Sequence, residues 1–320
     1  MRILLLSRNA ALYSTSRLVL VGRARDHTLD VVDPLELQLV VARGEPRLSC
    51  GGQRLPRYDA VIPRIGASIT HYGLSILREL ELGQATVLNG AAAIALSRDK
   101  VGSLATLAKA RVRVPATVCL RSVNGTEAAL GLVGGPPVVI KLQHGTQGVG
   151  TMIAESVRAL HAAVETFCAM GQEIVLQQYL KEARGRDLRA FVVGGKVVAA
   201  MRRVATKGEF RSNLHRGGSA ERVTLSRRLR SCAVKSARLT GLDVSGVDMV
   251  ETRDGPVVLE LNSSPGLEGL ESVSEEDVAT PIIALAERLV AERRKTPVAE
   301  RRRRPPATRK GRQRRKGSSA

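Results

Sequence analysis

The sequence predicts an α/β fold with at least two domains. Its 320 residues correspond to roughly two domains of about 150 residues each, enough to bury a core without disulfide or metal crosslinks. Hydrophobic residues form 43% and charged residues 25% of the chain, which excludes a wholly disordered, collagenous or membrane-embedded protein. Short apolar runs alternate with stretches of helical period, the pattern of strands that are connected by helices.

Residues 1–98 predict a first α/β domain. The expected strands are residues 3–6, 29–32, 60–63 and 85–88. The expected helices are residues 14–26, residues 69–82 and one that follows the Asn89–Gly90 pair. A domain boundary is expected near residue 98, because a new helical run (KVGSLATLAKA) begins after Asp99 and is followed by a break at Pro115.

Strands dominate the chain beyond this boundary. The expected strands are residues 117–120, 138–142, 174–176, 188–193, 197–200, 247–250 and 257–261. Helices are expected at residues 156–170 and 225–240, and no internal repeat is visible.

The net charge of +20 is unevenly distributed. Residues 293–320 hold 13 basic residues and one acid, so this tail carries +12 and the rest of the chain +8. With almost no apolar residues, the tail is expected to be a disordered polycation. Aromatic residues make up only 2% of the chain, so any contact with nucleic acid is expected to involve phosphates and not stacked bases.

Targeting signals and cysteine patterns are absent from the sequence. No apolar run approaches the roughly 18 residues of a membrane span, and residues 1–7 are too short for a signal-peptide core. Four scattered cysteines without a CxxC pair predict neither a disulfide framework nor a zinc site. A cytoplasmic protein without membrane contact is therefore expected.

Residues 138–151 (VVIKLQHGTQGVGT) favour a phosphate-binding loop. A predicted strand carries Lys141 near its end, and Gly145, Gly148 and Gly150 follow. Glycines allow backbone N–H groups to close over phosphate oxygens. The order GxxGxG matches neither GxGxxG nor GxxxxGK[ST], and a glycine-rich hairpin turn is an equal alternative for this segment alone.

Residues 246–266 (GVDMVETRDGPVVLELNSSPG) predict a strand pair with oxygen ligands. Alternation places Glu260 and Asn262 on one face together with Val258. A three-residue RDG turn sets Asp248 opposite Glu260, whereas a two-residue DG turn sets Asp248 opposite Leu261. The first register gathers oxygen ligands of the kind that Mg²⁺ or Mn²⁺ prefers, on a sheet face that is open to a bound ligand. The alternative is a solvated hairpin whose acids face water.

Residues 185–218 predict an anion-binding loop. Asp187 and Arg189 share one strand, and polar and basic residues follow: Arg202, Arg203, Lys207, Arg211, Ser212, Asn213 and Arg216. Guanidinium groups suit carboxylate and phosphate oxygens, so an anionic ligand is expected. Taken alone, a flexible basic loop without a ligand explains this composition better.

Together these segments resemble the ATP-grasp superfamily and, within it, the RimK branch of ribosomal-protein glutamate ligases. The similar stretches are MRILLLSRNAALYS, VVDP, DAVIPRIGASITHYG, RDK at 98–100, KLQHGTQGVG, FRSNLHRGG and ELNSSPGLEG, which cover about residues 1–290. The resemblance implies an α+β ATP-grasp fold, in which a Rossmann-like pre-ATP-grasp domain (1–98) precedes two α+β lobes that clamp ATP. These lobes would be a central lobe with the glycine-rich loop (99–176) and a C-terminal lobe with the metal site (177–292), followed by the tail (293–320).

The resemblance also implies roles for individual residues. The residues expected to bind ATP are Lys100, Lys141 at the α/β phosphates, Gly145, Gly148, Gln178 and Tyr179 in the hinge beside adenine, Asp187 at the ribose, and Arg211, Ser212 and Asn213. Asp248, Glu260 and Asn262 are expected to bind two Mg²⁺ or Mn²⁺ ions. Arg203 or Arg211 is the expected catalytic cation for a tetrahedral oxyanion.

Three features depart from the RimK pattern. Gln178 stands where a glutamate is expected in the hinge, NSSPG stands where NASPG is more usual, and the basic tail exceeds the expected length. The glutamine is expected to alter a side-chain contact to adenine and to leave backbone recognition intact. No role for the tail follows from the resemblance.

The resemblance implies an ATP-dependent ligase that adds L-glutamate to the C-terminus of small-subunit ribosomal protein six through an acyl phosphate. Synthesis of poly-α-glutamate is a further activity to test, with a poly-glutamate chain as acceptor. The alternatives are a carboxylate–amine ligase for a small metabolite and an RNA-binding protein that uses the basic tail. A homo-oligomer and contact of the tail with ribosomal RNA are also expected.

Overall fold

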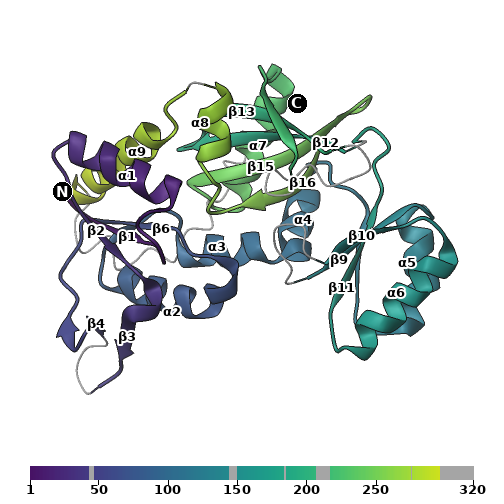
Figure 1. Cartoon of the computed structure of the whole chain (residues 1–320), viewed down its shortest axis with the longest axis horizontal. Coiled ribbons are helices and arrows are strands. Elements are labelled where there is room, and N and C mark those ends of the chain that lie inside the picture. Colours follow the sequence, from purple (N-terminus) through teal and green to yellow (C-terminus); the bar gives the residue numbers. More distant parts are fainter. Residues whose placement is uncertain (43–46, 144–149, 184, 207–216, 275, 296–320) are drawn as a thin grey trace, which may run out of the picture.

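The computed structural model describes residues 1–42, 47–143, 150–183, 185–206, 217–274 and 276–295. Its three larger sheets lie along the long axis of the molecule, with the N-terminal sheet at one end (Figure 1). This arrangement confirms the expected combination of an N-terminal α/β domain with two α+β lobes.

A parallel sheet of order β2-β1-β6-β7 forms the centre of the N-terminal domain. Its elements are β1 (Arg2–Leu6), α1 (Tyr13–Ala24), β2 (Thr28–Val32), β6 (Ala60–Pro63), α2 (Thr70–Leu82), β7 (Thr86–Val87) and α3 (Ala91–Arg98). Ile3, Leu4, Leu5 and Leu6 are all fully buried, because helices cover both faces of a parallel sheet and a continuous apolar run is needed. The predicted strands and helices of residues 1–98 are confirmed.

A small antiparallel sheet in the same domain was not predicted. It consists of β3 (Leu37–Val40), β4 (Arg47–Cys50) and β5 (Gln53–Arg54). Gly51 and Gly52 connect β4 to β5, both with positive φ angles, which is the signature of a two-residue hairpin turn. Short 3-10 helices occur at Pro34–Glu36, Ala67–Ile69 and Val123–Gly125.

The central lobe is an antiparallel sheet of order β10-β9-β11-β8, with two helices on one face (Figure 1). Its elements are β8 (Thr117–Leu120), α5 (Thr126–Val133), β9 (Val138–Leu142), β10 (Thr151–Ala154), α6 (Val157–Ala169) and β11 (Ile174–Gln178). Helix α6 begins after Ser156, whose side chain accepts a hydrogen bond from the Ala159 N–H. α5 and β10 were not predicted.

The C-terminal lobe is an antiparallel sheet of order β14-β13-β12-β15-β16. Its elements are β12 (Arg186–Val193), β13 (Lys196–Val204), β14 (Ser219–Arg222), α7 (Arg227–Leu239), β15 (Val244–Thr252) and β16 (Gly255–Asn262). Helices α7 and α4 (Lys100–Lys109) cover one face of this sheet. Asp99 caps α4 by accepting a hydrogen bond from the Gly102 N–H.

The opposite face of the C-terminal sheet is divided into a polar and an apolar half. Along β12, Asp187 and Arg189 alternate onto the same face as Phe191 and Val193, which are buried in a core shared with β1 and α1. The apolar half therefore packs on the N-terminal domain, and the polar half is left for the candidate site.

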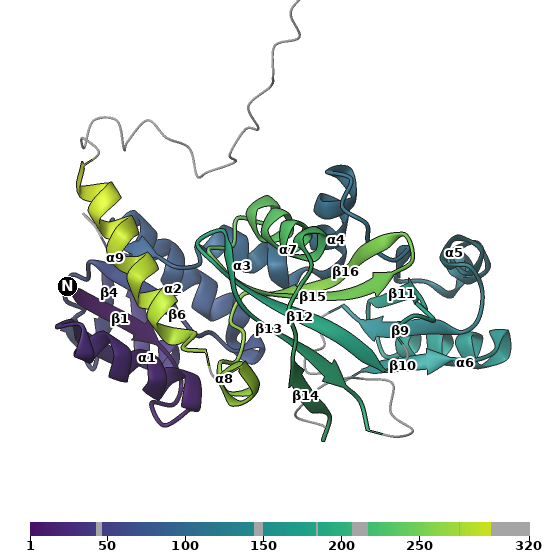
Figure 2. The ribbon, with the colours of Figure 1, turned by 90° about the horizontal axis from the view of Figure 1, so that it is seen from above.

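Two C-terminal helices return to the N-terminal domain. Helices α8 (Glu268–Ser274) and α9 (Ala279–Lys295) follow β16, and α9 lies beside α1 and β1 (Figure 2). The tail was predicted to be disordered from residue 293, which is wrong for residues 293–295, because they end α9 and Arg294 forms an ion pair with Asp59 at 2.8 Å. Residues 296–320 lie outside the described part of the chain. Among the described helices, including the 17-residue α9, none is long and apolar enough to cross a membrane.

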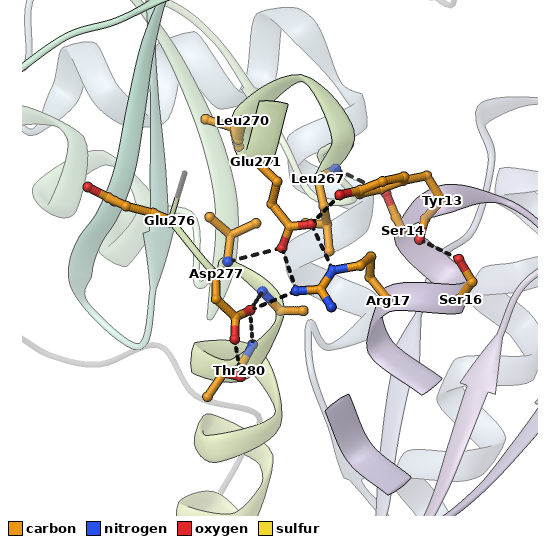
Figure 3. Close-up of polar contacts among 12 residues, drawn as sticks. Tyr13, Ser14, Ser16, Arg17, Leu267, Leu270, Glu271, Glu276, Asp277 and Thr280 are labelled. Atoms are coloured by element: carbon orange, nitrogen blue, oxygen red, sulfur yellow. Dashed lines mark hydrogen bonds and ion pairs between the residues drawn. The ribbon is translucent and has the colours of Figure 1, made fainter. Parts of the chain in front are cut away.

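A polar network joins α1 to α8 and α9 (Figure 3). The Glu271 carboxylate accepts hydrogen bonds from the Tyr13 hydroxyl at 2.6 Å and from Arg17 Nε at 2.9 Å, and Arg17 also reaches Asp277 at 3.3 Å. Partial burial opposes ionisation of Glu271, but the bonds from Arg17 and Tyr13 outweigh it and hold its pKa below the usual range. The network fixes the C-terminal helices on the domain that starts the chain.

Candidate active site

Two carboxylates face each other on the polar half of the C-terminal sheet. Asp248 of β15 pairs directly with Glu260 of β16, as the sequence predicted. The turn that sets this register differs from the predicted one, because Thr252 pairs with Gly255 across a two-residue turn and a β-bulge then shifts the register between Asp248 and Met249. The bulge also reverses the face of Val258, which is wrongly predicted beside Glu260 and in fact lies in the core under α7.

Asp248 is enclosed by two arginines. Arg189 donates two hydrogen bonds of 2.7 Å to the two carboxylate oxygens, and Arg203 donates a third of 2.8 Å. Burial alone would raise the pKa of Asp248, but the charges of Arg189 and Arg203 outweigh it and hold the pKa well below its usual range. Asp248 is 1% exposed, so the prediction that both acids are open to a ligand is wrong for this residue.

Arg203 also binds Asp187, its direct partner across β12 and β13. Two hydrogen bonds of 2.7 and 2.6 Å join the guanidinium to the Asp187 carboxylate. Burial opposes the charge on Arg203, but Asp248 and Asp187 outweigh it and raise the pKa of Arg203. In this arrangement Arg203 neutralises two acids, and its predicted oxyanion role and the ribose role of Asp187 stay predictions.

Glu260 carries the less compensated charge of the carboxylate pair. Burial and the neighbouring charge of Asp248 both raise its pKa, and the positive charge of Lys141 only partly opposes them. The Asn262 side-chain nitrogen Nδ2 donates to Asp248 at 3.3 Å and to Glu260 at 3.5 Å. A cation at this point would offset the repulsion between two like charges.

The described donors fit a divalent cation only in part. Two carboxylates and one amide oxygen are the hard ligands that Mg²⁺ prefers. Within the described ranges, no group of three or more His, Cys, Asp or Glu side chains is placed to hold a metal ion. Asp248, Glu260 and Asn262 would therefore supply part of a coordination shell, and a bound anion and water would complete it.

Two lysines from the central part of the chain lie near this cluster. Lys141 of β9 donates a 2.8 Å hydrogen bond to the Gln177 side chain on β11. Burial lowers the pKa of Lys141, although the charge of Glu260 opposes the shift. Lys100, in the first turn of α4, donates to the carbonyl oxygens of Leu142 and Gln143 at 2.9 and 2.8 Å. Burial lowers the pKa of Lys100 to about 8, although the charge of Glu260 opposes the shift.

The glycine-rich segment connects β9 to β10 as a hairpin. Lys141 pairs with Thr151, and the Leu142 N–H donates to the Gly150 carbonyl oxygen at 3.2 Å, so the loop begins after Leu142. Gly150 has a φ of +72°, and a Cβ at this position would lie 2.7 Å from the Leu142 side chain, so any other residue would be strained. The predicted phosphate contacts Gly145 and Gly148 lie outside the described residues, as do Arg211, Ser212 and Asn213.

The predicted adenine hinge lies where the central lobe ends. Gln178 is the last residue of β11, and its N–H donates to the Ala116 carbonyl oxygen at 2.8 Å. The Gln178 side chain is exposed and accepts a 3.4 Å hydrogen bond from the Ala116 N–H, and Tyr179 follows it. Both residues lie on the connection between the two lobes, and their nucleotide contacts stay predictions.

Arg189 is a site residue that sequence reasoning noticed without assigning a role. It pairs directly with Asp248 across β12 and β15 and donates two of the three arginine hydrogen bonds to that carboxylate. The signal was its alternation with Asp187 along one strand, which places both side chains on the same face. The pairing of β12 with β15 was needed to connect Arg189 to Asp248.

Comparison with known proteins identifies the architecture. The RimK pre-ATP-grasp domain family matches residues 1–94, and the RimK-like ATP-grasp domain family matches residues 97–286. The chain belongs to the RimK family of ATP-grasp proteins. Family members of this class are ATP-dependent ligases, and the chain is accordingly an ATP-dependent ligase with an ATP-grasp fold.

RimK family relatives cover nearly all of the described chain. Proteins named probable alpha-L-glutamate ligase from Vibrio vulnificus (strain YJ016) and Alkalilimnicola ehrlichii are 46% and 48% identical over 288 residues, which is 90% of this chain and 96% of each relative. Among solved structures, the ATP-grasp ligase PsnB in complex with a minimal precursor has a TM-score of 0.70 at 23% identity, covering 91% of this chain and 98% of that one. A RimK domain ATP-grasp protein from Sphaerobacter thermophilus has a TM-score of 0.68 at 24% identity, covering 90% of this chain and 100% of that one.

Proposed function

We propose that this RimK family ligase joins the amine of L-glutamate to a terminal carboxylate of an acceptor, either a ribosomal protein or a growing poly-α-glutamate chain. The names of relatives at 46–48% identity support glutamate as substrate. The observation that carries the proposal is the opposed Asp248–Glu260 pair with Lys100 and Lys141 nearby, because this arrangement suits a metal-bound triphosphate. PsnB, a structure with a similar fold, is described in complex with Mg and ADP.

In this proposal the acceptor carboxylate is activated before the amine attacks. Oxide is a poor leaving group, so attack of the carboxylate on the γ-phosphorus of ATP gives an acyl phosphate and ADP. Glutamate nitrogen then attacks the acyl carbon, an amide bond forms, and phosphate leaves. Divalent metal ions would supply charge neutralisation of the phosphates.

The side chains of this enzyme would position the reactants. Lys141 and Lys100 would bind phosphate oxygens, and Asp248, Glu260 and Asn262 would hold the metal ions. Arg189 and Arg203 keep Asp248 ionised and fixed in one orientation, since each donates to its oxygens. Arg211 remains the second proposed cation for the oxyanion.

Intact-mass spectrometry tests the proposed reaction. Purified protein, ATP, Mg²⁺ and L-glutamate are incubated with ribosomal proteins or with α-glutamyl-glutamate. We expect acceptor masses to increase by whole glutamyl units, with one ADP and one phosphate released for each unit. Growth of an acceptor with another amine, and never with glutamate, would contradict the assignment.

The tail is expected to affect encounter with ribosomes and not catalysis. Removal of residues 296–320 leaves α9 and the Arg294–Asp59 ion pair in place. Removal of residues 293–320 would shorten α9 and break this ion pair. Poly-glutamate synthesis is expected to stay unchanged. Ribosome binding is expected to weaken and to depend less steeply on salt, because fewer phosphate counterions are released. Co-sedimentation across a salt series measures this, and superimposable curves would show that the tail has no part in binding.

A further inference from the structure

Arg64 is a partly buried cation without a counter-charge among the residues that the structure describes. It directly follows β6. Within the described part of the chain, no hydrogen bond or ion pair to its guanidinium is found. Desolvation lowers the pKa of Arg64 to about 10, and no neighbouring carboxylate opposes this shift. A charge kept without a partner lowers stability, which is the expected cost of a group that waits for an anionic ligand.

The topology of the N-terminal sheet places Arg64 at its switch point. From β1 the chain proceeds to β2 on one side, and β6 then pairs on the other side of β1. In open parallel sheets, ligands bind at the carboxyl ends of the two strands between which the order reverses. Arg8 and Arg64 follow the carboxyl ends of β1 and β6, and the Arg64 N–H donates to the Leu6 carbonyl oxygen at 2.8 Å.

This switch point adjoins the carboxylate cluster. The Ser264 hydroxyl donates to the carbonyl oxygen of Pro63, which precedes Arg64, at 3.3 Å. Ser264 lies two residues after Asn262, a distance of at most about 7 Å along the chain. The Asn89 side chain, which follows β7, donates a 2.8 Å hydrogen bond to the carbonyl oxygen of Ser263, the residue before Ser264. The loop that leaves the cluster is thus held against the edge that carries Arg64.

The backbone around Arg64 is fixed by a second arginine. Arg98 donates from Nη2 to the carbonyl oxygen of Ile65 at 2.7 Å, and burial lowers the pKa of Arg98 as well. The two guanidinium groups make this edge electropositive, and no acid among the described residues is bonded to either of them. A planar guanidinium binds a carboxylate or a phosphate with two parallel hydrogen bonds, so the site suits an anion with paired oxygens.

We propose that Arg64, at the switch point between β1 and β6, binds a carboxylate of the amino-acid or peptide substrate and positions it beside the Asp248–Glu260 cluster. This inference rests on the proposed ligase function. The lysines expected to bind the triphosphate come from α4 and β9, so the N-terminal edge is available for the other substrates. Arg64 is a specificity residue in this account, and ATP binding does not depend on it.

Kinetics of Arg64→Gln test the proposal, with Arg57→Gln as the matched control. Arg57 is exposed and precedes the same strand, β6, at its amino end. Arg64→Gln is expected to raise the KM for L-glutamate or for α-glutamyl-glutamate about ten- to a hundredfold, the range for losing a charged hydrogen bond. A rise for free glutamate alone assigns the amino-acid carboxylate, and a rise for the dipeptide alone assigns the acceptor carboxylate.

Two further measurements separate binding from folding. The affinity for ADP with Mg²⁺ is expected to stay within twofold of wild type, and the melting temperature is expected not to fall, because an unbalanced charge is removed. Arg64→Lys keeps the charge without the guanidinium fork and is expected to give an intermediate KM. Unchanged KM values for both carboxylate substrates in Arg64→Gln would overturn the proposal.

The proposal can also be judged if the protein does not ligate glutamate. In that case the proposed function fails, and thermal shifts caused by L-glutamate, α-glutamyl-glutamate, succinate and inorganic phosphate are compared between wild type and Arg64→Gln. A shift by a carboxylate that Arg64→Gln abolishes supports the carboxylate site. Equal shifts in both proteins, no shift in wild type, or a shift by phosphate alone would overturn it.

Discussion

Glu260→Gln is expected to lower the rate of ATP-dependent ligation by about a hundredfold or more, because loss of a residue that only supports a metal ligand already costs about 10- to 100-fold. The substitution keeps the shape of the side chain and removes the charge that a divalent cation would bind. Because Glu260 faces Asp248 and burial already disfavours its ionised form, the neutral variant is expected to melt at the same temperature or higher. ADP release and thermal unfolding measure the two effects.

Asp248→Asn is expected to lose both activity and stability. Arg189 and Arg203 together donate three hydrogen bonds to this carboxylate. The variant removes the carboxylate that Arg189 binds and leaves Arg203 with Asp187 alone. Breaking a buried ion pair costs about 3–5 kcal/mol. The two variants therefore distinguish the roles of the two acids. Glu260→Gln is expected to affect catalysis alone, and Asp248→Asn is expected to affect both catalysis and stability.

Glu251→Gln is the control for both substitutions. Glu251 is an exposed acid on the same strand as Asp248 and pairs with Pro256. It is expected to leave both the rate and the melting temperature unchanged. Near-wild-type turnover of Glu260→Gln at limiting Mg²⁺ would show that Glu260 does not bind the metal.

Asn89→Ala is expected to lower the free energy of unfolding by about 3–5 kcal/mol, a large effect for one side chain. The Asn89 side chain is 1% exposed and forms four hydrogen bonds of 2.7–2.8 Å. It donates to the carbonyl oxygens of Val244 and Ser263 and accepts from the N–H groups of Asp243 and Val244. Alanine leaves all four backbone groups buried without these partners.

Denaturant titration measures this loss, with Asn124→Ala as control. Asn124 is exposed, and no hydrogen bond from its side chain is found among the described residues. Asn89 follows β7 in the N-terminal domain and its partners lie in the C-terminal lobe, so the variant is expected to loosen the two parts relative to each other. If Asn89→Ala and Asn124→Ala unfold at the same denaturant concentration, the four bonds do not hold the lobes together.

Local patterns predicted most of the strands and helices. The run ILLL in β1 and the alternation of Asp187, Arg189 and Phe191 in β12 report burial and side-chain direction directly, because strand side chains alternate with a period of two. The elements that were missed are β3, β4, β5, α5, β10, β14, α8 and α9. Most of them are short, whereas α9 has apolar residues at helical spacing and was not recognised.

The oxygen cluster shows how a correct prediction can depend on an incorrect turn. The sequence places Asp248 opposite Glu260 only for a three-residue turn, and the observed turn has two residues. A bulge one residue before Glu260 on β16 restores the predicted pairing. Bulges follow from how a whole sheet twists and packs, so local turn chemistry does not reveal them.

The sequence by itself determined the α/β character, the order of most strands along the chain and the two acids of the candidate site. Those features depend on residues within one strand or one turn. Only the tertiary structure decided that Arg189 and Arg203 bind Asp248, that Arg64 lacks a described partner, and that α9 packs on the domain that begins the chain. Each of these joins residues from separate strands or domains, and burial and hydrogen bonding between distant segments are not encoded in any local period.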